Sequence, residues 1–250
     1  MTMDLTGWLV SGLAVLLTGI SKSGMGGALG GLAVPFMAIW LGPGEALAVM
    51  LPVLIAMDLA GIRAWRGKAA REELWRLVPA ALVGIVLGSL VFGMLSERTV
   101  KGVLGTIAVV FAGHRLLRRV PLEASPGPSG RIFPWLCGVG SGVTSTLAHA
   151  GGPPVLIYLL TRRLSRVPHV ATLVYFFTFI NLAKLPFYIG IGLFSRDSLL
   201  MSLAFLPLVP VGVWLGTRLL AKIPERPFFL FATAALGISG IVLLRDALMV

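Results

Sequence analysis

The stretch from Ser21 to Pro35 reads SKSGMGGALGGLAVP, and the stretch from Gly140 to Val155 reads GSGVTSTLAHAGGPPV. Both stretches are rich in glycine, and a shift of 121 positions lays one on the other, with Gly19 on Gly140. Neither suits an uninterrupted helix, yet both interrupt long apolar segments. Non-helical backbone inside a membrane is tolerated only where it is buried in protein or lines a cavity. A matched pair of broken segments, one in each half of a chain, points to the binding site of a transporter.

The composition indicates an integral membrane protein. Hydrophobic residues make up 57% of the chain and charged residues 12%, against about 25% charged residues in a soluble domain. Most of the apolar segments approach the roughly 20 residues that a helix needs to cross the hydrocarbon core. The first residues lack a basic region, so we expect no cleavable signal peptide. Cys137 is the only cysteine, which excludes an intramolecular disulfide and a cysteine metal cluster.

The basic residues are concentrated in alternate loops. Of the 21 lysines and arginines, most lie in the connections 63–76, 115–131, 162–166 and 218–226, which the positive-inside rule assigns to the cytoplasm. This distribution explains the net charge of +11 without nucleic-acid binding. Basic residues flank the second glycine-rich segment on both sides and are missing from both flanks of the first. The two segments are therefore predicted to enter the membrane from opposite sides.

The sequence thus predicts an all-α polytopic membrane protein made of two inverted repeats. Each repeat is expected to hold one broken helical hairpin followed by three transmembrane helices. The protein is predicted to lie in the cytoplasmic (inner) membrane, with both termini on the outer side. In the first repeat, residues 1–120, we expect the hairpin over 5–41 and helices over about 46–62, 74–95 and 99–117. After a Pro/Gly/Ser-rich linker over 121–130, the second repeat, 131–250, is expected to hold a hairpin over 132–160 and helices over about 167–194, 198–217 and 227–244.

Each break is expected to place a helix N-terminus inside the membrane. Free backbone N–H groups and about half a positive charge attract anions there, and Pro35, Pro153 and Pro154 are typical of a first helical turn. Close glycine packing between helices is the alternative explanation of the glycines. Small hydroxyl side chains beside the breaks can donate hydrogen bonds to an oxyanion. The predicted contacts of this kind are Ser21 and Ser23 in the first half and Thr144, Ser145 and Thr146 in the second.

Three ionisable side chains lie within apolar segments, where a charge costs roughly 2.5–3.5 kcal/mol on insertion scales. Lys184 lies far from both ends of its segment, and we predict that it anchors the anion. Lys22 lies at the first break, where it either contacts the anion or extends to the membrane surface. Asp58 is expected to pair with a basic group or to carry a coupling proton, and an interfacial pair with Arg63, five positions later, is the alternative.

Two further polar residues accompany these groups. Asn181 precedes Lys184 by three positions, so the two share a helix face and Asn181 is a candidate second donor. His149 precedes the second pair of glycines. It is a candidate anion contact or coupling residue because histidine titrates near neutral pH, and a structural hydrogen bond is the alternative.

At these residues the chain resembles the sulfite exporter TauE/SafE family of membrane transporters. The matching features are GGLAVP at 30–35, GIRAWRG at 61–67 and AHAGGPPV at 148–155, and the resemblance covers essentially the whole chain. It implies transport of small sulfur-containing anions such as sulfite or organosulfonates, often outward. Lys22 within the first glycine run departs from the family pattern. That pattern falls on Gly26, Gly27, Gly30, Gly31, Pro35, Gly151, Gly152, Pro153 and Pro154, so these glycines join the expected binding residues.

We therefore predict a secondary transporter that exports sulfite or an organosulfonate by alternating access. An anion channel or facilitator, or a carrier of another small carboxylate, is the alternative. We expect no enzyme, since the three histidines are scattered and no HExxH or GxSxG motif is present. We also expect no cofactor and no metal. The expected partners are the small anion, protons as candidate coupling ions, and membrane lipid; nucleic acid is not expected, and the sequence leaves the oligomeric state open.

Overall fold

The computed structural model describes residues 3–25, 31, 33–117, 130, 132–162, 164–219 and 225–249. These residues form eleven helices and no strand, so the fold is all-α as expected. Three of the predicted binding residues, Gly26, Gly27 and Gly30, lie outside the described residues, as does almost all of the expected linker, 121–129.

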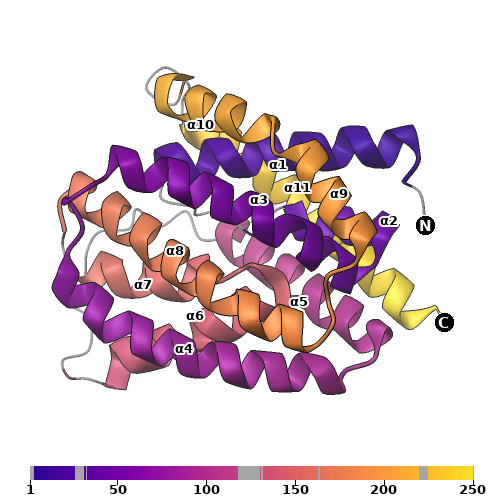
Figure 1. Ribbon diagram of the computed structural model, residues 1–250, viewed down its shortest axis with the longest axis horizontal. Helices are drawn as coiled ribbons and strands as arrows, with labels where there is room; N and C mark the ends of the chain where they lie inside the picture. Colours follow the sequence, from indigo (N-terminus) through magenta and orange to yellow (C-terminus); the bar gives the residue numbers. More distant parts are fainter. Residues whose placement is uncertain are drawn as a thin grey trace.

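Two helical hairpins lie where the glycine-rich stretches occur, and single helices follow each of them (Figure 1). Both chain ends lie at the same end of the bundle in Figure 1. The helices of the first half are α1 (Leu5–Met25), α2 (Ala33–Leu41), α3 (Pro43–Ala64), α4 (Arg71–Met94) and α5 (Glu97–Leu117). Those of the second half are α6 (Ile132–Ala148), α7 (Gly152–Thr161), α8 (Arg166–Gly190), α9 (Arg196–Phe205), α10 (Leu208–Leu219) and α11 (Glu225–Leu248).

Each hairpin has one long and one short arm. The long arms α1 and α6 have 21 and 17 residues, and the short arms α2 and α7 have 9 and 10. At about 1.5 Å per residue, a short arm extends over roughly half the thickness of a bilayer core. The N-termini of α2 and α7 therefore lie within the body of the bundle. Pro153 stands in the first turn of α7, where its missing N–H costs nothing.

The prediction of one continuous helix over about 198–217 is wrong in one respect, because two helices occupy this range. The chain bends there by 43° between α9 and α10. Pro207 lies at this break, and proline disrupts a helix because it lacks the N–H and clashes with the preceding turn. The bent pair still forms one candidate span.

Among the described residues, four helices are long and apolar enough to cross a membrane, and there are five such spans if the bent pair α9–α10 counts as one. The four are the spans Leu5–Ser23 of α1, Pro43–Arg63 of α3, Arg71–Met94 of α4 and Val167–Gly190 of α8. The crossings expected over about 99–117 and 227–244 correspond to α5 and α11, which have 21 and 24 residues but are not among these spans.

The outer surface of the bundle is apolar, as in a membrane protein. On α4, Leu82, Val86 and Leu90 are exposed, whereas Leu77 and Ile85 are fully buried. A soluble protein would place polar side chains on the outer face of such a helix. The exposed leucines and valines are suited to contact with lipid tails. The surface of the bundle and the length of its helices are therefore both typical of an integral membrane protein.

Glycines allow three helix pairs to approach closely, which is the usual way that helices associate in a membrane. In the α4–α6 pair, an added Cβ on Gly84 would lie 2.2 Å from the Val139 carbonyl oxygen. In the α1–α10 pair, an added Cβ on Gly19 would lie 3.2 Å from the Gly212 Cα atom. In the α5–α11 pair, Gly105 and Gly240 face each other in the same way. Each pair joins a helix of the first half to a helix of the second.

Candidate functional site

Two helices of the first half and one of the second bring three polar side chains together in the interior. Lys22 of α1 forms an ion pair with Asp58 of α3, with Nζ 2.5 Å from Oδ1. Asn181 of α8 donates a hydrogen bond of 2.7 Å from Nδ2 to the second carboxylate oxygen, Oδ2. All three side chains are buried. The Lys22 ammonium also lies 5.4 Å from the centre of the Phe177 ring, a favourable position for a cation.

One turn further along α8, Lys184 is fully buried and holds the end of α6. Its ammonium nitrogen lies 3.2 Å from the Ser145 carbonyl oxygen, 3.0 Å from Ser145 Oγ and 2.7 Å from His149 Nδ1. An ammonium group has three hydrogens, so these three acceptors account for all of them. A cation at this place also compensates the negative C-terminal end of α6.

His149 forms the turn between α6 and α7 and is held on both sides of its ring. It has a positive φ of 50°, which is uncommon for a residue other than glycine. Its Nε2 atom lies 3.1 Å from the Leu47 carbonyl oxygen of α3. A carbonyl only accepts, so Nε2 carries a hydrogen and Nδ1 accepts from Lys184. The expected alternative of a structural hydrogen bond therefore describes the geometry of His149.

The two hairpins meet at their turns. An added Cβ on Gly31 would lie 3.0 Å from the Ala150 Cα atom and 3.2 Å from the His149 carbonyl oxygen. Within the second turn, Ser141 donates a hydrogen bond of 2.6 Å to the Gly151 carbonyl oxygen. An added Cβ on Gly151 would lie 2.8 Å from the Ser141 carbonyl oxygen, so the turn needs glycine there for close packing.

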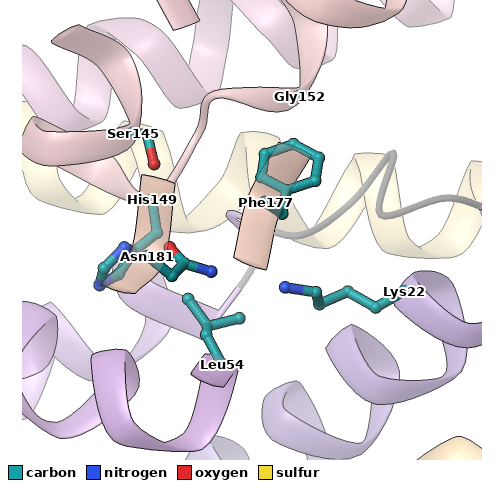
Figure 2. A pocket seen from close by; sticks show the side chains of 7 residues that line it. All are labelled: Lys22, Leu54, Ser145, His149, Gly152, Phe177 and Asn181. Atoms are coloured by element: carbon teal, nitrogen blue, oxygen red, sulfur yellow. The ribbon is translucent and has the colours of Figure 1, made fainter. Parts of the chain in front are cut away.

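A small cavity lies between these groups. Figure 2 shows Lys22 and Asn181 reaching toward each other across it, with Leu54, Phe177, Ser145, His149 and Gly152 around them. Gly152 is the first residue of α7, so the N-terminus of that helix borders the cavity. The free volume is about 10 Å³, which is room for about one water molecule. An ammonium, an amide and a helix N-terminus lining one cavity form a donor set that suits an anion.

The hydroxyl groups predicted to bind the anion are mostly engaged elsewhere. Ser23 donates to the Gly19 carbonyl oxygen at 2.9 Å, Thr144 to that of Gly140 at 2.7 Å and Thr146 to that of Gly142 at 2.9 Å. These bonds to the preceding helical turn are the usual behaviour of such residues inside helices. Ser21 is fully buried on α1 and is not among the cavity residues. Of the predicted hydroxyls, Ser145 alone lines this cavity.

Two expectations for the ionisable residues are changed by the geometry. Asp58 pairs with Lys22 in the interior, so neither the interfacial pair with Arg63 nor the extension of Lys22 to the membrane surface describes these residues. Lys184, the predicted anchor, is not among the cavity residues.

Three residues of the site were not predicted: Leu54 of α3, which lines the cavity, and two residues of α8. Phe177 lines the cavity, and Tyr188 donates a hydrogen bond of 2.7 Å to the Thr146 carbonyl oxygen of α6. Both lie four residues from a residue that was predicted, on the same face of α8. Extending the face of Asn181 and Lys184 by one turn each way would have found them.

A second polar cluster joins α4 to α7 at the end of the bundle where the α3–α4 connection lies. Glu73 is buried and accepts hydrogen bonds from the Tyr158 hydroxyl and from Arg162 Nε, the latter at 2.7 Å. Arg76 Nη1 lies 3.7 Å from the same carboxylate. The cluster fixes the outer end of the short arm α7. Across the described ranges, no group of three or more His, Cys, Asp and Glu side chains is arranged to hold a metal ion.

The family model described as sulfite exporter TauE/SafE matches residues 11–243 of the chain. The match covers all eleven helices in whole or in part and includes every residue of the cavity. Neither the comparison with curated proteins nor that with solved structures found a match.

Proposed function

Because the chain belongs to the sulfite exporter TauE/SafE family, we propose that it is a secondary transporter that exports sulfite or an organosulfonate across the cytoplasmic membrane. Membership in this family supports an integral membrane transporter of a small anion. The proposed substrate site is supported by one observation, the buried cavity that is bordered by the N-terminus of α7, the Lys22 ammonium and the Asn181 amide. All three donate hydrogen bonds and two of them carry positive charge, which suits a tetrahedral or pyramidal oxyanion.

Within this site the two lysines have different roles. Lys22 lines the cavity and gives one hydrogen to Asp58, so its remaining hydrogens are available to an anion oxygen. Lys184 already donates to three protein acceptors. We therefore assign the direct anion contact to Lys22, with Asn181 and the Gly152 N–H, and treat Lys184 as a positioning residue that holds the α6–α7 turn beside the cavity.

The helix contacts support the inverted-repeat arrangement of the proposal. The long arm of the first hairpin, α1, packs against α10, and that of the second, α6, packs against α4. The partner helices carry glycines at the same spacing, Gly84 and Gly88 in α4 and Gly212 and Gly216 in α10. Two further pairs, α3 with α8 and α5 with α11, join helices at corresponding places of the two halves. This exchange of contacts is what a two-fold relation between inverted halves would produce.

The size of the cavity favours a carrier over a channel. A space of about 10 Å³ holds about one water molecule, so an oxyanion requires movement of the surrounding helices to enter and leave. Such movement is the basis of alternating access, whereas a channel needs a continuous path past the site. The two hairpins, which meet at Gly31 and Ala150, are the elements that we propose to move relative to each other.

The test is anion flux into proteoliposomes that contain the purified full-length protein. Sulfite, sulfoacetate, taurine and sulfate are compared with acetate, and saturable flux of a sulfur oxyanion is expected. Lys22→Met should abolish saturation, and the thermal unfolding temperature should fall as well, because the substitution leaves the buried Asp58 carboxylate without its ion-pair partner. Lys68→Met, which removes an exposed lysine from the α3–α4 connection, is the matched control and should transport normally. Saturable flux of acetate alone would move the substrate to carboxylates, and linear, non-saturating flux would favour a channel.

A further inference from the structure

The buried polar cluster carries a defined number of charges. Within the described part of the chain, its ionisable side chains are the ammonium groups of Lys22 and Lys184, the Asp58 carboxylate and the His149 imidazole. Each lies in the interior with at most 7% of its surface exposed. At such depth water does not screen charge, so the net charge of the cluster, rather than any one contact, decides which ions it accepts.

The hydrogen bonds indicate the protonation state of the Lys184–His149 pair. His149 Nε2 faces a carbonyl oxygen and carries a hydrogen, and its Nδ1 atom faces the Lys184 ammonium at 2.7 Å. Protonation of Nδ1 would set two donors against each other. The imidazole is therefore neutral. Three acceptors surround the Lys184 nitrogen, which matches the three hydrogens of an ammonium group, so we assign one positive charge to Lys184. Both ring nitrogens of His149 are occupied, which leaves it without a place for a coupling proton.

The Lys22–Asp58 ion pair contributes no net charge, because the two groups are 2.5 Å apart and cancel each other. With Lys184 the cluster thus has a surplus of one positive charge before an anion enters. An anion with a single negative charge makes the loaded site neutral. A dianion would leave one negative charge in the interior, which is costly unless a proton accompanies it.

Building on the proposed function, we propose that the site accepts one net negative charge per cycle: a small monoanionic oxyanion alone, or a dianion together with one proton that binds to Asp58. In the second case the proton adds to a carboxylate oxygen of Asp58, the ion pair with Lys22 is lost, and Lys22 and Lys184 together balance the dianion. The proton travels with the dianion and leaves with it, so charge and protons balance over the cycle.

Asp58 is the group suited to this proton because of what surrounds it. Lys22 of α1 and Lys184 of α8 are the charged side chains that act on it, and Asn181 of α8 donates to it. The other helices packed against α3, which are α2, α5, α9 and α10, bring no charged side chain to Asp58 among the described residues. Asp58 is also the carboxylate that pairs with a cavity lysine, so its protonation changes the charge at the cavity directly.

The decisive experiment compares methanesulfonate, a monoanion, with methanedisulfonate, a dianion of the same chemistry. Both are strong acids that stay fully ionised across the working pH range, so a proton can bind only to the protein. In wild-type proteoliposomes, methanesulfonate flux should not respond to an imposed pH gradient. Methanedisulfonate flux should rise about tenfold for each unit by which the pH on the uptake side is lowered, until Asp58 is protonated, and it should carry one proton per anion inward.

Asp58→Asn imitates the protonated carboxyl group and raises the net charge of the empty cluster from one to two positive charges. We expect it to shift the flux ratio toward methanedisulfonate by about tenfold or more and to remove the pH response. Asp246→Asn, a partly exposed change beside Arg245, is the matched control and should leave the ratio unchanged.

The outcomes separate this inference from the function on which it rests. Saturable flux of both sulfonates with a pH-independent ratio would overturn the charge rule and leave the transporter intact, and the wild-type protein alone decides this if Asp58→Asn does not fold. An unchanged ratio in a folded Asp58→Asn protein would overturn it as well. Absence of saturable flux for sulfite and for both sulfonates would overturn the proposed function itself.

Discussion

The close contact between α4 and α6 makes Gly142 a sensitive position. In Gly142→Ala, the new Cβ would lie 2.1 Å from the Ala81 carbonyl oxygen and 2.9 Å from both the Gly84 Cα atom and the Ile85 nitrogen. An ordinary contact needs 3.4 Å or more, so the two backbones would have to separate by about 1.3 Å at that point. Overpacking of this kind costs about 1–3 kcal/mol.

The same substitution also has a favourable part, since alanine is a better helix former than glycine by about 0.5–1 kcal/mol. We expect a net loss of about 2 kcal/mol in the free energy of unfolding, because the obstacle is backbone that no side-chain rotation relieves. For a chain of this length, this corresponds to a fall of about 4–8 °C in Tm. The measurement is thermal unfolding of the purified protein in detergent.

Gly140→Ala is the matched control for this prediction. It lies two residues away on the same helix, and the nearest atoms to its new Cβ are those of Pro154, at 3.8 Å. Only the helix-propensity gain applies, so Gly140→Ala should be as stable as the wild type or more stable. If Gly142→Ala unfolds at the same temperature as Gly140→Ala, the reasoning from backbone contact is refuted.

Three further outcomes are expected. A membrane-impermeant maleimide is applied to intact cells that carry single-cysteine variants without the native cysteine. It should label Ser96→Cys, and it should label Lys68→Cys only after the cells are opened. The reverse result would mean that the protein has the opposite orientation in the membrane. Tyr158→Phe removes the hydroxyl bonded to a buried carboxylate and should lower the free energy of unfolding by about 1.5–3 kcal/mol, measured by chemical denaturation, and no change would mean that the bond contributes little. Lys184→Met should lower both Tm and anion affinity, whereas a weaker affinity at unchanged Tm would return Lys184 to the role of direct anchor.

The breaks in the hairpins were predictable from the sequence, because glycine and proline act locally on the backbone. Gly31 and Gly151 occur where the chain turns and where neighbouring backbone leaves no room for a side chain. The bend between α9 and α10 had an equally local sign in Pro207. That signal was present in the sequence, but hydropathy over a long apolar run conceals a proline that does not end the run.

The partners of the polar side chains were less accessible to sequence reasoning. The position of Lys184, far from both ends of its apolar segment, indicates the interior, whereas the sequence left Lys22 and Asp58 open between the interior and the membrane interface. Which of them faces the cavity depends on the rotation of α1 and α8 and on how closely the glycine contacts bring the helices together. Thr144 shows the same limit, because its hydroxyl bonds either to an anion or to its own helix, and the sequence is compatible with both.

The exchange of contacts between the halves also bears on the order in which the protein assembles during synthesis. Helix α1 leaves the ribosome well before its principal partner α10, which is separated from it by eight helices. Until then, Gly12 and Gly19 lack the contacts that they make with residues 205–212 in the finished protein. The first hairpin therefore lies in the bilayer without its packing against α10 while most of the chain is inserted. A fragment that ends after α5 would keep this face open, and two such fragments inserted in opposite orientations could satisfy each other, as an antiparallel pair of half-length chains.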